Sequence, residues 1–285
     1  MTFTFGSRNI TQDEATNRAK NIQTLQLNCT LFFEESLPHF FAMVTLTFTT
    51  KTETVTLDFT GASTFTSSLV NGTTGLVESL GSRGVVVVSG CTTDGTPNQV
   101  QLHYVGHTSA VSQGLQSYNS TSGERSLFSQ GEPTGLSRWL PCCDQPSIRH
   151  ALKLTVVAPA AWLLAANGPV ESHTSADATT VRTYRDALRA AGAGTGDSAD
   201  SSFARWEFAE TPAIPPHTIA LTGGDMHREE IAPLRVAQSA REIPLSIYVR
   251  KSVLASGETC VDDLRDILEC AKASAVYFGE LFGMP

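Results

Sequence analysis

The sequence has little charge and no long apolar run. Asp, Glu, Lys and Arg together form 17% of its 285 residues, and the formal net charge is −8. Nucleic acids and anionic membranes select for basic patches, so this balance argues against either as a partner. No run of about 18 apolar residues occurs, so no segment is expected to span a bilayer. Residues 1–20 lack the apolar core of a signal peptide, which predicts a cytoplasmic protein.

Several catalytic signatures are also missing. The sequence contains no G-x-S-x-G, no P-loop and no G-x-G-x-x-G. The glycine run at residues 192–197 has no predicted strand before it and no helix after it, which excludes it as a phosphate site. The six cysteines form no C-x-x-C pair. Free buried thiols in a reducing compartment are therefore the preferred interpretation, ahead of a zinc ribbon or a redox pair.

His103 and His107 have the spacing of the two histidines in an H-E-x-x-H zinc site. Tyr104 stands where the glutamate is needed, and Gly106 argues against a helix. On a strand, four residues span about 13 Å, which is too far for two side chains to share a metal. We therefore interpret both histidines as surface residues of a strand.

Strand patterns dominate the first three quarters of the sequence. Val55, Leu57 and Phe59 alternate with polar residues, which is the period-2 pattern of a half-buried strand. Comparable segments cover residues 25–33, 40–49, 84–89, 100–104, 152–158, 163–166, 179–184, 203–208 and 217–221. Turn residues separate them at intervals of roughly ten residues. This spacing predicts a mainly β fold with a large antiparallel β-sandwich domain.

The pattern changes near the C-terminus. A strand at residues 244–250 precedes a segment at 258–281 in which apolar residues recur at three- and four-residue spacing, which predicts one long amphipathic helix. Gly283 is placed to end that helix. We predict a polar leader at residues 1–22, a β domain at 23–235 with a disordered insertion at 186–202, and the start of a second domain at 236–285.

Residues 126–146 are dense in turn formers and hold Glu132 between Gly131 and Pro133. A glutamate in such a loop is, by itself, most often a solvated charge. However, residues 128–159 resemble a signature of the zinc aminopeptidases of the aminopeptidase N and leukotriene hydrolase family. The matching positions are Gln130, Glu132, Arg138, Trp139, Leu140, Pro141, Cys142, Asp144 and Pro146. A second segment, residues 203–226, resembles the family's F-x-E-T-P and G-D elements.

The resemblance implies a saddle-like N-terminal β domain that packs on a thermolysin-like catalytic domain. Residues 236–285 would be the truncated start of that catalytic domain, because its H-E-x-x-H motif is not in this sequence. Zinc would then act in the parent enzyme, and this chain alone would bind no zinc and cleave no peptide. The implied partners are the N-terminus of a peptide substrate and the remainder of the chain's own polypeptide.

Gln130 and Glu132 carry over from the family as substrate-binding residues. An aminopeptidase recognises a protonated amine, and a carboxylate fixed by its loop can pair with that ammonium. Glutamate rather than glutamine at position 132 favours peptide cleavage over epoxide hydrolysis. By the same resemblance, Arg138, Asp144 and the neighbouring cysteines would be structural and would fix the turn that holds the loop.

Two other functions stay open at this point. One is a non-catalytic β-sandwich interaction domain, against which the unpartnered terminal helix argues. The other is a bifunctional epoxide hydrolase and aminopeptidase, which would need a longer sequence to decide.

Overall fold

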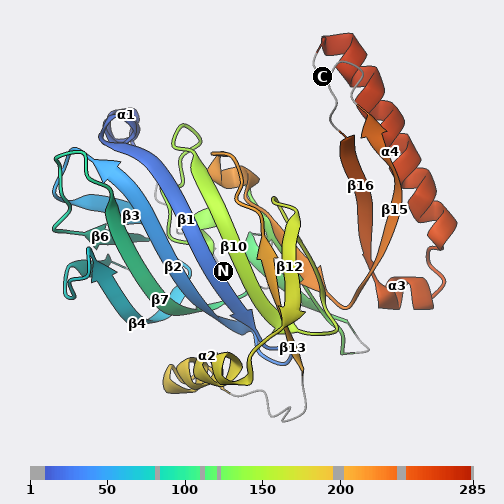
Figure 1. Ribbon diagram of the computed structural model, residues 1–285, viewed down its shortest axis with the longest axis horizontal. Coiled ribbons are helices and arrows are strands. Elements are labelled where there is room, and N and C mark those ends of the chain that lie inside the picture. Colours follow the sequence, from blue (N-terminus) through green and yellow to red (C-terminus); the bar gives the residue numbers. More distant parts are fainter. Residues whose placement is uncertain are drawn as a thin grey trace, which may run out of the picture. The chain divides into compact units, whose positions relative to one another are not determined.

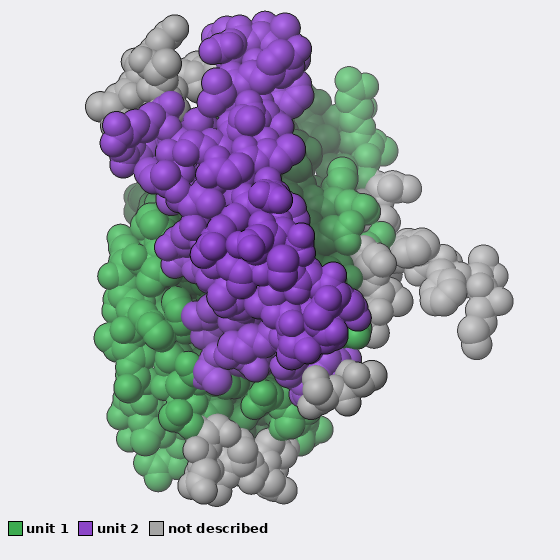
Figure 2. Space-filling view, turned by 90° about the vertical axis from the view of Figure 1, so that its right-hand side faces the viewer, with its two compact units in different colours: residues 1–118, 127–160, 164–222 green, residues 119–126, 161–163, 223–285 purple. Residues whose placement is uncertain are grey.

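The structure is a computed structural model that describes residues 10–80, 84–109, 113–120, 123–194, 202–235 and 242–283. The chain divides into two compact units, which Figure 2 draws in different colours. Unit 1 comprises residues 1–118, 127–160 and 164–222, and unit 2 comprises residues 119–126, 161–163 and 223–285. Strands dominate the described residues, which confirms the prediction of a mainly β fold. The last segment of unit 2 begins at residue 223, and the domain boundary expected at residue 236 stays a prediction.

Unit 1 is built around a seven-stranded sheet (Figure 1). Its order is β12 (Val170–Ser175), β13 (Phe203–Phe208), β10 (His150–Pro159), β1 (Ile22–Phe33), β2 (His39–Thr50), β7 (Asn98–His107) and β4 (Ala62–Val70). Buried and half-buried residues alternate along most of β2, because successive side chains point to opposite faces of a sheet. Neighbouring strands are antiparallel, as predicted, except that β1 runs parallel to β10.

Two smaller sheets contain the other strands that the structure describes among the first 224 residues. One contains β3 (Val55–Asp58), β6 (Val85–Val88) and β5 (Val77–Leu80), in that order. The other has the order β11 (Leu163–Ala166), β14 (Leu221–Gly224), β9 (Arg125–Gln130) and β8 (Gly114–Asn119). β8 lies in a segment for which no strand was predicted. The segment predicted as a strand at 217–221 instead contains a single 3-10 turn, η3 (Pro216–Thr218), followed by β14.

A helix, α2 (Ala178–Ala190), replaces the strand predicted at residues 179–184. Asp177 caps it by accepting a hydrogen bond from the Thr180 amide at 2.8 Å. Val181, Tyr184 and Leu188 fall on one face of the helix and pack into a core cluster with strand residues such as Phe32 and Phe203. The helix also includes the first residues of the insertion predicted to be disordered, so that prediction is wrong for residues 186–190. Residues 195–201 lie outside the described part.

The predicted polar leader contains a helix, α1 (Gln12–Asn21), which begins after the cap residue Thr11. Arg18 on this helix forms a buried ion pair with Asp58 at the end of β3. Burial of a charged side chain is costly unless a partner compensates it, so this pair holds α1 in place. Residues 1–9 lie outside the described part.

Unit 2 consists mainly of a hairpin and two helices. β15 (Met226–Arg235) pairs with β16 (Glu242–Arg250), which confirms the strand predicted at 244–250. α3 (Lys251–Ala255) and α4 (Val261–Phe282) follow. The long helix predicted at 258–281 is therefore confirmed, and Gly283 ends it with a left-handed φ of 62°. The cap residue is Cys260, whose amide donates to Asp263 at 2.8 Å.

α4 packs on the hairpin through a small part of its apolar surface. Leu264 and Leu268 are buried, and Lys272 donates to the Ala232 carbonyl of β15. The exposed fractions of six other apolar residues lie between 45% and 62%; these are Ile267, Val276, Tyr277, Phe278, Leu281 and Phe282. Within the described residues, no helix combines the length and the apolar character that a membrane crossing requires.

Candidate functional site: the loop after β9

The predicted substrate-binding loop begins where β9 ends, at Gln130. A Cβ atom at Gly131 would lie 1.9 Å from the carbonyl oxygen of His217, so only glycine permits this close approach of two backbones. The Glu132 carbonyl accepts from the Gly135 amide at 2.7 Å, and Thr134 between them has a φ of 73°. These features fold the Gly-Glu-Pro-Thr-Gly segment into a tight turn with Glu132 and Pro133 exposed.

Two glutamines form a hydrogen-bonded chain that leads to Glu132. Gln116 on β8 donates from Nε2 to Oε1 of Gln130 at 3.2 Å, and Gln130 donates from Nε2 to Oε1 of Glu132 at 3.1 Å. Gln116 is buried and Gln130 half-buried. An ionised carboxylate has about four acceptor sites, so this single bond orients the Glu132 side chain and leaves capacity for a cationic ligand. The structure thus brings together the two predicted site residues.

Gln116 was not identified from the sequence. It lies in a segment for which no strand was predicted, and no local pattern connects it with Gln130. The contact arises because β8 and β9 are neighbours in the four-stranded sheet.

Asp144 has a structural position at the base of the loop. Its Oδ2 accepts from the Ser137 amide at 2.9 Å, which supports the single turn η2 (Leu136–Arg138). Its own amide donates to Oδ2 of Asp58 at 2.9 Å, and Asp58 also holds Arg18. Burial raises the pKa of Asp144, whereas the hydrogen bonds with Ser137 act in the opposite direction. These contacts support the predicted role of Asp144 in fixing the turn.

The two adjacent cysteines of the motif are buried and free. Burial raises the pKa of both thiols, that of Cys143 to about 12, so both are protonated near neutral pH. The Cys142 amide and carbonyl exchange hydrogen bonds with the backbone of Asp58. The prediction of free cysteines holds for all six, but Cys260 and Cys270 are exposed rather than buried.

His150 lies beside these cysteines and is fully buried. Its Nε2 accepts a hydrogen bond from the Cys143 amide at 3.3 Å. Burial lowers the pKa of His150 to about 4, so the ring is neutral near pH 7. His150 therefore belongs to the packed support of the loop.

A zinc site does not fit the residues that the structure describes. Among them, no group of three or more His, Cys, Asp or Glu side chains could hold a metal ion. His103 and His107 lie on β7, where they pair with Met43 and His39 of β2. Of the glycine run at 192–197, only residues 192–194 are described, and they follow α2 without opening a new helix.

The fold is shared with solved zinc metallopeptidases. The M1 zinc metallopeptidase from Deinococcus radiodurans is 17% identical, with a TM-score of 0.62, and the match covers 81% of this chain and 48% of that chain. A point mutant of the enzyme from the same organism, bound to a Tyr-Ser-Ala substrate, is 18% identical with a TM-score of 0.61, and the match covers 80% and 48% of the two chains. The present chain thus spans about half the length of these enzymes.

The peptidase M1 N-terminal domain model matches residues 24–189, which is more than half of the sequence. The chain belongs to this family, in agreement with the resemblance carried by residues 128–159. A comparison with curated protein sequences finds no match. The family match includes Gln130, Glu132 and Asp144.

Proposed function

We propose that this chain is the substrate-anchoring N-terminal domain of a zinc metallo-aminopeptidase, in which Gln130 and Glu132 bind the N-terminus of a peptide. Support comes from the family match together with one observation: the exposed Glu132 carboxylate is oriented by Gln130 at the tip of a tightly packed loop. A peptide α-amino group has a pKa of about 7.7–8.0 and is largely protonated near neutral pH. The carboxylate would pair with this ammonium and position the first peptide bond of the substrate.

Zinc and the residues that bind it would belong to the remainder of the parent polypeptide. The isolated chain is expected to bind no stoichiometric zinc and to cleave no peptide. Metal analysis and a peptide-cleavage assay on the purified chain test this expectation. Tight stoichiometric zinc or measurable aminopeptidase activity would contradict it.

The remainder of the polypeptide is also the proposed partner of α4. The apolar side chains of this helix that face away from the hairpin are about half exposed. Full burial of a wholly exposed side chain of this kind contributes roughly 1.5–3 kcal/mol, so covering these half-exposed side chains would contribute a part of that for each. The surface is consistent with a helix that becomes buried in the complete enzyme.

The role of Glu132 is tested by replacing it with Ala in the full-length parent enzyme. Loss of the ammonium partner is expected to weaken binding of substrate and transition state by roughly 2–4 kcal/mol, which lowers kcat/KM by about 30- to 900-fold. Glu78→Ala, which removes an exposed glutamate from β5, is the matched control and should leave kcat/KM unchanged. Unchanged kinetics in Glu132→Ala would remove this residue from the substrate site.

A further inference from the structure

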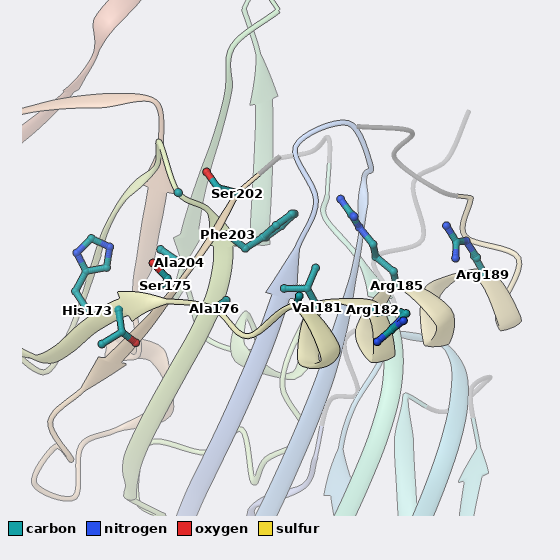
Figure 3. Close-up of a pocket in the computed structure, with 13 residues that line it drawn as sticks. His173, Ser175, Ala176, Val181, Arg182, Arg185, Arg189, Ser202, Phe203 and Ala204 are labelled. Atoms are coloured by element: carbon teal, nitrogen blue, oxygen red, sulfur yellow. The ribbon is translucent and has the colours of Figure 1, made fainter. Parts of the chain in front are cut away.

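Unit 1 contains a groove of about 760 Å³ that the loop after β9 does not line. Its walls are α2, the end of β12 and the start of β13, and we call it the arginine groove after Arg182, Arg185 and Arg189 (Figure 3). His173, Ser175 and Phe203 also line it. Among the described residues that line it, none is Asp or Glu, although the whole chain carries a net charge of −8.

The three arginines differ in how far their charge is already compensated. They lie three and four residues apart and therefore share one side of α2. Arg185 is engaged within the fold: it forms an ion pair with the buried Glu34, and its guanidinium lies 5.1 Å from the centre of the Phe203 ring. Figure 3 shows Arg185, Arg189 and the Phe203 ring pointing to the same side.

Arg189 and Arg182 have charge that a ligand could use. Arg189 contacts Asp186 at 3.0 Å, but both side chains are more than half exposed, and such pairs contribute little. Arg182 is exposed and has no hydrogen bond or ion pair with another described side chain. Asp177, whose pKa it helps to lower, is occupied as the cap of α2. Arg182 can therefore contact a ligand carboxylate directly, and Arg189 can do so by giving up its weak contact with Asp186.

The groove is bordered by the edge of a sheet. β12 is the terminal strand of the seven-stranded sheet, and β13 is its only partner strand in the described part of the chain. The Ala176 amide donates to the Phe203 carbonyl on β13. Because backbone groups alternate in direction along an antiparallel strand, those of Ser175 and His173 point away from β13. An extended chain could pair with these groups.

We propose that the arginine groove binds an extended, acidic segment of polypeptide. The backbone of the segment pairs with the free edge of β12, while two of its carboxylates contact Arg182 and Arg189. The strand edge favours a polypeptide over a small anion, since a small anion would leave the outward backbone groups of β12 unused. This proposal is independent of the role of Glu132, because the two sites share no residue.

The test uses the full 285-residue chain and fluorescein-labelled ten-residue peptides of alternating Glu and Thr. Fluorescence anisotropy at low ionic strength is expected to show saturable binding, which a Gln and Thr peptide of the same length does not show. Arg182→Gln combined with Arg189→Gln is expected to raise Kd at least about tenfold. The control combines Arg149→Gln with Arg235→Gln, which removes the same charge from exposed positions outside the groove and should leave Kd within about twofold.

Ser175→Pro distinguishes a polypeptide from a simple anion. It removes an outward amide while the ladder to β13 is kept, so it is expected to raise Kd for the acidic peptide about fivefold or more. Thermal unfolding monitored by circular dichroism verifies that each variant is folded. The proposal is overturned if the acidic peptide shows no saturable binding. It is also overturned if the double variant Arg182→Gln, Arg189→Gln binds this peptide as tightly as the unaltered chain does. It is also overturned if Ser175→Pro leaves Kd unchanged while inorganic phosphate competes, because the groove would then be a simple anion site.

Discussion

The carboxylates at the tip and at the base of one loop, Glu132 and Asp144, differ in exposure and in hydrogen bonding. At the tip, Glu132 is exposed and accepts a single side-chain hydrogen bond, from Gln130. At the base, Asp144 is half-buried; its carboxylate accepts from the Ser137 amide, and its own amide donates to Asp58. The comparison separates a carboxylate used to build the loop from one that stays exposed and that we propose binds the substrate.

The base is stiff because several buried polar groups satisfy one another there. Tyr104 donates to the Trp139 carbonyl at 2.6 Å, and both side chains are almost fully buried. Asp58 connects this base to α1 through Arg18. A polar side chain at a tip supported in this way loses little additional freedom when it binds a ligand. The base therefore holds the loop in place, and the tip carries the carboxylate that we propose binds the substrate.

The largest effect is expected from Asp58→Ala, which removes the acceptor shared by Arg18 and the Asp144 amide. It leaves a buried guanidinium without its partner, and we expect a loss of about 3–5 kcal/mol in the free energy of unfolding. Urea unfolding followed by tryptophan fluorescence measures this. Asp266→Ala, at an exposed position of α4, should change stability by less than about 0.5 kcal/mol. Similar stabilities for the two variants would show that the base is not held by this network.

A smaller loss in the free energy of unfolding is expected when the pH is lowered, through protonation of His150. The pKa of His150 is about 4 in the folded state, against about 6.5 in the unfolded chain, so the unfolded state binds this proton first as the pH falls. The neutral ring therefore makes its full contribution to the free energy of unfolding above pH 6.5. About 3 kcal/mol of that free energy is lost as the pH falls from 6.5 to 4.

Urea unfolding at a series of pH values between 7 and 4 measures this loss. In His150→Gln the free energy of unfolding should depend less on pH between 6.5 and 4, whereas His107→Gln, at an exposed position, should keep the original pH dependence. An unaltered slope in His150→Gln would assign the acid sensitivity to other groups.

The smallest effect on stability is expected at the tip. Glu132→Gln keeps the shape of the side chain and removes its charge, and because the group is exposed we expect a change of less than about 0.5 kcal/mol in the free energy of unfolding. Thermal unfolding of the isolated chain tests this, with Asp144→Ala, which removes the acceptor of the Ser137 amide, as the half-buried counterpart that should be clearly destabilised. A loss above about 1 kcal/mol in Glu132→Gln would place Glu132 in the scaffold and weaken the contrast between tip and base.

Local patterns predicted the elements that carry strong periodicity. β2 and α4 were recognised because their apolar residues recur with a period of 2 or 3.6. α2 was mistaken for a strand because its first residues, Thr179 to Val181, are β-branched. Its cap Asp177 and the spacing of Val181, Tyr184 and Leu188 were the available signals. The packing of these three side chains on the sheet stabilises the helix over a strand, because tertiary contacts outweigh weak propensities.

Residues 128–159 were enough to predict the family and the two residues proposed to bind substrate, because turn chemistry and motif order are local properties of that segment. The side chains and backbone groups that support these two residues could not be predicted in this way. The groups that support the loop come from separate parts of the chain; they are Gln116, Asp58, Arg18 and the His217 carbonyl. Such contacts depend on which strands become neighbours, and strand neighbours are selected by the burial of whole faces rather than by any short segment.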